Sequence, residues 1–203
     1  MEQPARINHP DLAEPLRSRW SPSVFDAAHE IAAADVELLL EAARWAPSAG
    51  NRQPWRYLVL PRGSAGHAAL VEHLSRGNAG WVPRASLLLV STIARGADGN
   101  DFGDLHVPLH DLGQATAHLT LQAHAMGLHV HQFAGFDHAA VAAALGVPDD
   151  ALVLAGIAVG RRGDAAEVDP RDAEREQRER VRRPLGEIAF GDRWGEAWTP
   201  AEG

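Results

Sequence analysis

The 203-residue chain contains no cysteine and no lysine, so all 19 of its basic residues are arginines. The absence of cysteine excludes a disulfide scaffold, a cysteine-ligated metal site and a thiol nucleophile. The absence of lysine excludes Schiff-base catalysis and a Walker-type phosphate loop. With 27 acidic residues the formal net charge is −8, which argues against nucleic acid as a partner, because such binding needs a basic face.

Long apolar runs are also missing. The longest, residues 87–90 and 151–159, have the length of buried strands rather than the roughly 20 residues of a membrane span. The first 15 residues are polar and acidic, unlike a signal peptide. We therefore expect a soluble, cytoplasmic protein without a membrane partner. Its length, 45% apolar residues and 23% charged residues suit one domain with an extension.

Apolar periodicity predicts helices that alternate with strands. Helices are expected over residues 11–20, 35–43, 66–74, 105–126 and 137–145, the fourth closed by Gly127. Strands are expected over residues 55–60, 86–93, 129–133 and 151–159. This order predicts an α/β or α+β fold around a small central sheet.

Residues 161–183 differ from the rest, because they hold eight arginines and seven acidic residues and are almost devoid of apolar side chains. Three acid–arginine pairs stand four residues apart in the order that favours a helix: Glu174/Arg178, Glu176/Arg180 and Glu179/Arg183. We interpret this segment as a solvated helix or an arm that lies across another surface.

Three polar segments are candidates for ligand binding, and each also has an ordinary structural interpretation. Residues 46–55 contain two prolines, a glycine and an asparagine, which predict either a ligand-binding loop of fixed shape or a plain helix–strand connection. Residues 17–23 hold two arginines and three serines, which suit a phosphate or a solvated turn. Arg180, Arg182 and Arg183 are by themselves typical of a solvated face.

The histidines do not predict a metal site. His106 and His110 have a spacing that can bind zinc, but there is no HExxH arrangement, and Pro108 is expected to break the helix between them. Surface or interface histidines are the better interpretation. Residues 156–163 lack the GxGxxG spacing, so a Rossmann dinucleotide site is not expected.

Six stretches occur in the order found in FMN-dependent nitroreductases. They read RWSPSVF (residues 19–25), EAARWAPSAGNRQPWRYLVL (41–60), GNAGWVPRASLLLV (77–90), DLGQATAHLTLQAHAMGLHVHQFAGFD (111–137), GIAVGRRGD (156–164) and RRPLGEIAF (182–190). The chain resembles this family over residues 16–194.

The resemblance implies an α+β sandwich with a central, mostly antiparallel sheet flanked by helices, in an interwoven homodimer with FMN at the interface. It divides the chain into a polar extension (1–15), the FMN-binding domain (16–163) and a charged arm with a terminal segment (164–203). It also implies a ping-pong cycle in which NADH or NADPH reduces a small electron-poor acceptor, such as a nitroarene or quinone, through flavin N5. The alternatives are other flavin chemistry (reductive dehalogenation or flavin breakdown) and a flavin-binding protein without turnover.

The resemblance assigns FMN contacts to the residues that match the family's motifs. These are Arg19, Trp20, Ser21 and Ser23 in the opening motif, Pro47, Ser48, Ala49, Asn51 and Gln53 in a loop along the partner's flavin, Asn78 at the pyrimidine edge, Gln132, Ala134 and Gly135 beside the ring, and Arg182 with Arg183 or Arg180 at the phosphate.

Two positions depart from the family. Many members have a cation where this chain has Ser23, and many have an acidic residue where it has Ala134. No catalytic side chain is implied, because the flavin carries the redox chemistry. His129 or His131 is expected to approach the flavin from the strand end. Three tryptophans, at positions 20, 55 and 81, are expected to supply apolar surface to the dimer interface.

Overall fold

The computed structural model describes residues 11–94 and 105–199. Its helices and strands, in chain order, are α1 (Glu14–Ser18), α2 (Ala33–Arg44), β1 (Trp55–Pro61), α3 (Ala65–Glu72), β2 (Leu87–Ala94), α4 (His106–Ala125), β3 (His129–Phe133), α5 (His138–Ala144), β4 (Ala151–Gly160) and α6 (Pro170–Glu176). Each helix and strand expected from the sequence is present, with ends that differ by a few residues. Of the polar extension expected over residues 1–15, residues 1–10 lie outside the described part.

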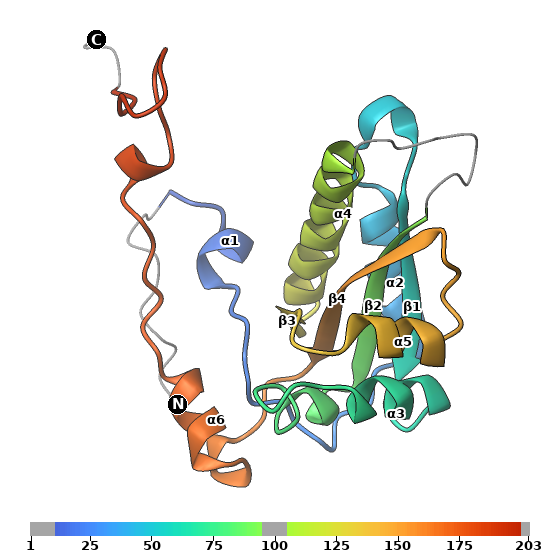
Figure 1. Cartoon of the computed structure of the whole chain (residues 1–203). Coiled ribbons are helices and arrows are strands. Elements are labelled where there is room, and N and C mark those ends of the chain that lie inside the picture. Colours follow the sequence, from blue (N-terminus) through green and yellow to red (C-terminus); the bar gives the residue numbers. More distant parts are fainter. Residues whose placement is uncertain (1–10, 95–104, 200–203) are drawn as a thin grey trace.

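The four strands form one sheet in the order β1-β2-β4-β3, with every neighbouring pair antiparallel. Side chains of β2 alternate between two apolar cores. Leu87 and Leu89 pack with α2 and α4 on one face, and Leu88 and Val90 pack with α3 and α5 on the other. The fold is therefore an α+β sandwich of helices, sheet and helices, as Figure 1 shows, and this prediction is confirmed.

The long helix α4 includes both His106 and His110, so the expected break at Pro108 is wrong. Pro108 lies in the first turn, where a helix has no intrahelical partner for its N–H groups and the missing donor costs no bond. At the other end Gly127 has a positive φ of 73°, a conformation that favours glycine and ends the helix as expected. Within the described residues, no helix is long and apolar enough to cross a membrane.

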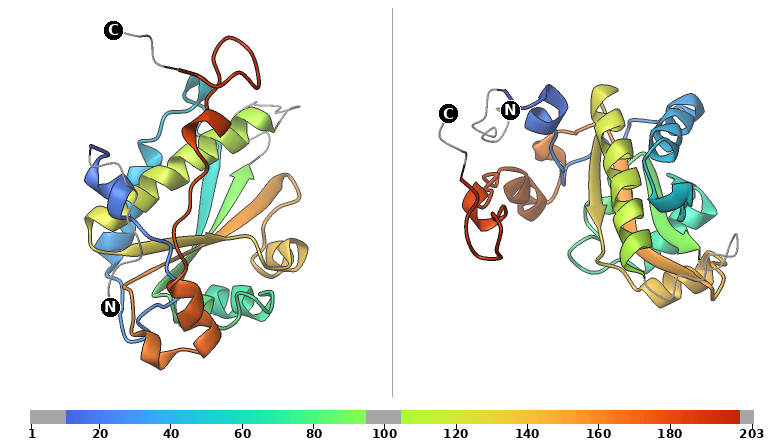
Figure 2. Two further views of the ribbon diagram at one scale, coloured as in Figure 1. Left: turned by 90° about the vertical axis from the view of Figure 1, so that its left-hand side faces the viewer. Right: turned by 90° about the horizontal axis from the view of Figure 1, so that it is seen from above.

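The segment after β4 leaves the sandwich. Its helix α6 ends at Glu176, and residues 177–199, here called the C-terminal arm, extend past α1 on one side of the molecule (Figures 1 and 2). The expected i,i+4 pairing along one solvated helix is wrong, because Glu176 is buried and pairs with Arg162 instead of Arg180. The arm itself exposes five large apolar side chains by more than half: Val181, Leu185, Ile188, Trp194 and Trp198.

The tryptophans expected at the dimer interface are placed differently. Trp55 and Trp81 are 7% and 1% exposed and belong to the two cores of the sandwich, so this expectation is wrong for both. Trp55 begins β1 and Trp81 precedes β2, and each side chain fills the core beside its strand. Trp45, Trp194 and Trp198 are the exposed tryptophans of the described chain, at 73%, 91% and 52%.

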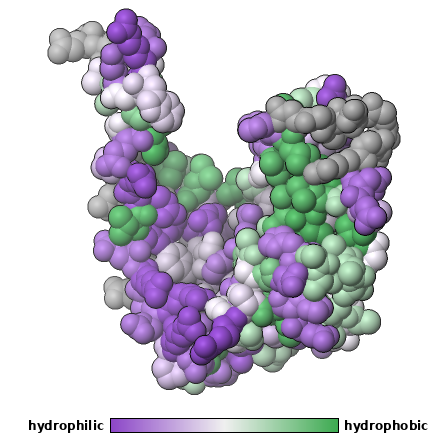
Figure 3. Space-filling model, viewed as in Figure 1, coloured by the Kyte–Doolittle hydropathy of each residue, from purple (hydrophilic) through white to green (hydrophobic). Residues whose placement is uncertain are grey.

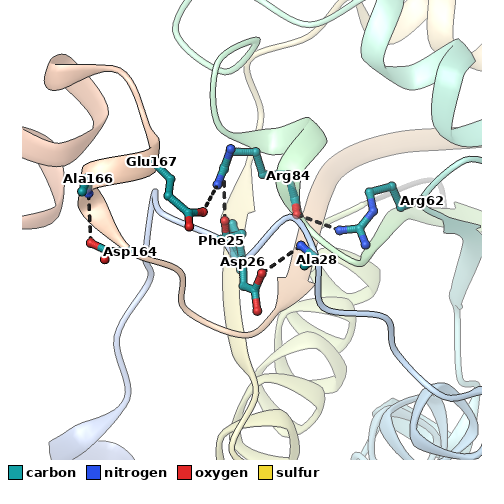
Figure 4. Close-up of polar contacts among 8 residues, drawn as sticks. All are labelled: Phe25, Asp26, Ala28, Arg62, Arg84, Asp164, Ala166 and Glu167. Carbon is teal, nitrogen blue, oxygen red and sulfur yellow. Dashed lines mark hydrogen bonds and ion pairs between the residues drawn. The ribbon is translucent and has the colours of Figure 1, made fainter.

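A polar network fastens the N-terminal segment to the sandwich (Figure 4). The side chain of Arg84 donates from Nε to the carbonyl oxygen of Phe25 (3.0 Å) and pairs with Glu167 (3.3 Å). Arg62 donates in turn to the carbonyl oxygen of Arg84 (3.1 Å). A Cβ at Gly163 would lie 2.8 Å from the backbone of Phe25, so glycine permits this close approach. The segment that precedes Phe25, which carries Arg19 and Ser21, is thereby held from its C-terminal side.

Candidate functional site

A cavity of about 410 Å³ lies between the N-terminal segment, α4 and β3. It is lined by Leu16, Arg19, Ser21, Ala117, Thr120, Leu121, Val130, His131 and Gln132. Its volume falls within the range of small-ligand pockets. Figure 3 shows a hollow on this side of the molecule, between the C-terminal arm and the apolar surface of α4. Three of the candidate site residues, Arg19, Ser21 and Gln132, therefore line one cavity.

Arg19, Arg180 and Arg182 converge beside this cavity, although more than 150 residues separate Arg19 from the other two along the chain. Burial lowers the pKa of Arg19, and the positive charge of Arg182 lowers it further. Burial likewise lowers the pKa of Arg180, followed by the charges of Arg19 and Arg182. We call these three residues the arginine cluster. The charges that shift both pKa values are those of other arginines, so the cluster concentrates positive charge.

Hydrogen bonds fix two members of the cluster. Arg19 donates from Nη1 to Ser21 Oγ (3.1 Å), and Arg180 donates from Nη1 to the carbonyl oxygen of Arg17 (3.2 Å). The guanidinium of Arg180 also lies 5.5 Å from the centre of the Trp20 ring. Its Nη2 is buried without a hydrogen-bond partner in the described structure. An orphaned donor within repelling cations fits a phosphate group, which carries about −1.5 to −2 charge and three acceptor oxygens.

Arg183 and Ser23 are placed differently from the residues that line the cavity. Arg183 is exposed and pairs with Glu187 at 3.5 Å. Ser23 is 2% exposed, and its backbone N–H donates to Glu176 Oε2 (2.7 Å). From the sequence alone, Arg180 could be named only as an alternative to Arg183, because both are arginines in one charge-rich run. Contacts with Arg17 and Trp20 distinguish Arg180, and local sequence carries no signal of them.

His131 lines the cavity as a neutral ring. Its Nδ1 lies 2.8 Å from the carbonyl oxygen of Pro22, which can only accept, so Nδ1 carries the hydrogen and Nε2 is an acceptor. Burial lowers the pKa of His131, and the charges of Arg175 and Arg19 add to this effect. The ring stacks on Trp81 at 4.3 Å between centroids. Beside it Gln132 donates weakly from Nε2 to Thr120 Oγ1 (3.5 Å).

Asn78, Ala134 and Gly135 meet at the end of β3, outside the residues that line the cavity. Asn78 donates from Nδ2 to the carbonyl oxygen of Gly135 (3.0 Å), and its Oδ1 accepts from the indole of Trp81 (3.2 Å). A Cβ at Gly135 would lie 2.6 Å from Asn78 Nδ2, so this contact requires glycine. Ala134 is exposed. The candidate side chain of Asn78 thus fixes the loop after β3.

The loop with Pro47, Ser48, Ala49, Asn51 and Gln53 has a fixed shape but does not line the cavity of its own chain. Gly50, Asn51 and Gln53 have positive φ angles of 59°, 56° and 48°. Ser48 Oγ accepts from the N–H of Gln53 (3.0 Å). The N–H of Ala49 donates to Oδ2 of the buried Asp111 on α4 (3.0 Å). Sequence reasoning missed Asp111, which stood within a helical pattern without a loop signal.

Replacing His129 by glutamine should make the protein less sensitive to acid. Burial, followed by the charges of His124 and Arg162, lowers the pKa of His129 from 6.5 to about 4. Between these pH values the unfolded chain binds a proton that the folded chain does not, so the free energy of unfolding falls as the pH falls. Glutamine does not titrate and removes this contribution. Urea unfolding at about pH 7 and about pH 4.5 measures the difference, with the exposed His118→Gln as control. An unchanged pH slope in His129→Gln would contradict the assignment.

Among residues 11–94 and 105–199, no group of three or more histidine, aspartate or glutamate side chains is placed to hold a metal ion. Near the end of α4, His124 Nε2 instead lies 2.6 Å from the hydroxyl of Ser18 in α1. The site is therefore built from arginines, hydroxyls and neutral polar groups around a partly apolar cavity.

Comparison with known protein families shows the class to which this chain belongs. The sequence pattern of the nitroreductase family matches residues 16–90 and 66–161. The chain belongs to this family.

Two solved structures and one curated protein are informative relatives. The chain is 31% identical to an oxidoreductase containing FMN, with a TM-score of 0.82 over 97% of this chain and 99% of that one. It is 25% identical to a Desulfovibrio desulfuricans protein solved in complex with FMN, with a TM-score of 0.72 over 93% and 99%. It is also 39% identical over 122 residues to an uncharacterized 15.4 kDa protein of Mycolicibacterium smegmatis, covering 60% of this chain and 80% of that protein.

Proposed function

We propose that this protein is an FMN-dependent oxidoreductase that passes a hydride from NADH or NADPH to a small electron-poor acceptor, such as a nitroarene or quinone. The arginine cluster at the edge of the cavity carries this proposal. It offers the charge that an FMN phosphate needs, and the cavity continues from it along α4 and β3. Two relatives that match almost the full chain contain FMN, which supports the same cofactor here.

The chain's own residues would bind and orient the cofactor. The arginine cluster would neutralise the phosphate, and Ser21 and the unprotonated Nε2 of His131 would bind hydroxyl groups of the ribityl chain. Gln132 at the far end of the lining would contact the ring. When bound, FMN supplies the redox chemistry, accepting a hydride from the nicotinamide and then donating one to the acceptor. The apolar wall of Ala117, Leu121 and Val130 would exclude water from the ring.

We further propose that the working unit is a homodimer. The C-terminal arm exposes Leu185, Ile188 and Trp194 by 61%, 63% and 91%, which is unusual for a segment without an apolar partner. The rigid loop held by Asp111 lies away from its own cavity and would contribute Ser48 and Asn51 to the partner's cofactor. Both features have a role if two copies exchange their arms.

A reductive half-reaction followed by an oxidative one tests the proposed function. The purified protein should bind FMN at one per chain, and NADH or NADPH should bleach it under anaerobic conditions. A nitroarene or quinone should then restore the colour. A flavin that neither nicotinamide reduces would favour other flavin chemistry on the same scaffold. A reduced flavin that no organic acceptor reoxidises would indicate a binding protein without turnover.

A further inference from the structure

Glu176, at the end of α6, carries a carboxylate that is almost fully buried, with 1% exposure. Three groups from distant parts of the chain approach it. Trp20 Nε1 donates to Oε1 (3.1 Å), the backbone N–H of Ser23 donates to Oε2 (2.7 Å), and Nε of Arg162 pairs with Oε1 (2.7 Å). One side chain thus joins the N-terminal segment, the exit of β4 and the base of the C-terminal arm.

The chemistry of this contact requires a carboxylate. Two partners donate hydrogen bonds and the third, Arg162, is a cation, so an ionised carboxylate suits all three. A protonated acid or an amide would turn a donor toward one of these donors. Burial raises the pKa of Glu176, but the N–H of Ser23, the charge of Arg162 and the indole of Trp20 act in the opposite direction. The charge is therefore buried together with its counter-charge, which is the condition under which proteins retain such groups.

The two groups that Glu176 binds from the N-terminal segment, Trp20 and Ser23, lie on either side of Ser21 in the sequence. Trp20 is adjacent to Arg19, and its ring face carries the guanidinium of Arg180. Ser23 follows Ser21 by two residues. Glu176 precedes Arg180 by four residues and lies where the chain leaves α6 and enters the C-terminal arm. It does not line the cavity and lies outside the arginine cluster.

We propose that Glu176 is a positioning residue that brings Arg19 and Arg180 together for the phosphate of FMN. It fixes the plane of the Trp20 ring, on which Arg180 rests, and it sets the register of residues 19–23 against the arm. Arg19 and Arg180 repel each other and would move apart without the contacts of Glu176. The inference rests on the proposed function and adds to it a residue that acts on the cofactor without touching it.

The test compares FMN with riboflavin, which lacks the phosphate. In Glu176→Gln the affinity for FMN, followed by flavin fluorescence, should fall at least about tenfold, the size expected when hydrogen bonds to a charged group are lost. The affinity for riboflavin should fall much less, because only Ser21 among its proposed contacts lies in the segment that Glu176 holds, whereas FMN also loses the arrangement of the arginine cluster. The matched control is Glu174→Gln, an exposed acid of the same helix, which should leave both affinities unchanged.

A second variant keeps the inference testable if Glu176→Gln does not fold. Trp20→Phe retains a ring face for Arg180 but removes the N–H that Glu176 accepts, so it should also weaken FMN more than riboflavin. An equal loss for the two flavins would reduce Glu176 to a purely structural role and overturn the inference. Unchanged FMN affinity in both variants would overturn it as well. A wild-type protein that binds no FMN would instead reject the proposed function, and the inference with it.

Discussion

Replacing Arg19 by alanine should weaken FMN binding by about 10- to 150-fold, which corresponds to the roughly 1.5–3 kcal/mol of hydrogen bonds to a charged group. Arg19 both lines the cavity and belongs to the arginine cluster, so its guanidinium is the member best placed for a phosphate. Arg182→Ala should act in the same direction, because its charge acts on Arg19. Isothermal titration of the apoprotein with FMN measures each change.

A comparison of Arg180→Ala with Arg183→Ala separates the cluster from a general charge effect. Each variant removes one positive charge from the same short run of sequence. Arg180 lies in the cluster with an unpartnered Nη2, whereas Arg183 pairs with Glu187 in solvent. We expect a strong loss of FMN affinity for Arg180→Ala and less than about a twofold change for Arg183→Ala.

The assignment of the phosphate site would be wrong if Arg19→Ala and Arg182→Ala both retained full FMN affinity.

Most of the fold could be predicted from the sequence, because local patterns determine its elements. The run at residues 86–93 is mostly apolar and has four consecutive apolar residues at 87–90, as a central strand with both faces covered requires, and β2 is that strand. The end of α4 at Gly127 could also be predicted, because a glycine after a helical pattern is a local signal. Pro108 misled because a proline reads as a helix breaker unless the helix start is known within a few residues. Three-dimensional structure was needed to place it in the first turn.

The candidate site could be predicted only where a motif carries it. Arg19, Ser21 and Gln132 match family motifs and line the cavity. The wall on α4 has ordinary small and apolar residues with no signal of a ligand. Glu176 shows most clearly which contacts could not be predicted from the sequence. Among seven acidic residues in a charged run it looked like one half of a solvated pair, and its real partners, Trp20 and Ser23, lie more than 150 residues earlier.

The residues expected at the interface show the same limit. An aromatic side chain near a loop is compatible with an interface or a core, and local sequence does not distinguish the two. Trp55 and Trp81 fill the cores, whereas the exposed tryptophans lie at the end of α2 and in the C-terminal arm. Only their burial in the folded chain distinguishes the tryptophans of the cores from the exposed ones.

Ending the chain after Gln177 should abolish the proposed dimer and most of the FMN affinity while leaving the sandwich folded. The truncation removes Arg180 and Arg182 together with the apolar side chains of the arm, but it retains α6 and the buried contacts of Glu176. An obligate homodimer of this kind should bury more than about 2,000 Å² in total, and the arm carries five large apolar side chains that are more than half exposed. Sedimentation velocity and FMN titration of the same sample measure both losses.

A shorter chain that ends after Gly163 provides the contrast. It also removes Glu176, so the donors of Trp20 and Ser23 and the charge of Arg162 lose their acceptor, at a cost of about 1–3 kcal/mol for each buried group left unsatisfied. This variant should therefore unfold at a lower urea concentration than the chain ending after Gln177, which keeps α6 and the buried contacts of Glu176. Two results would contradict the proposed assembly. One is a full-length protein that sediments as a monomer and still holds one FMN per chain, and the other is a chain ending after Gln177 that remains a dimer with unchanged FMN affinity.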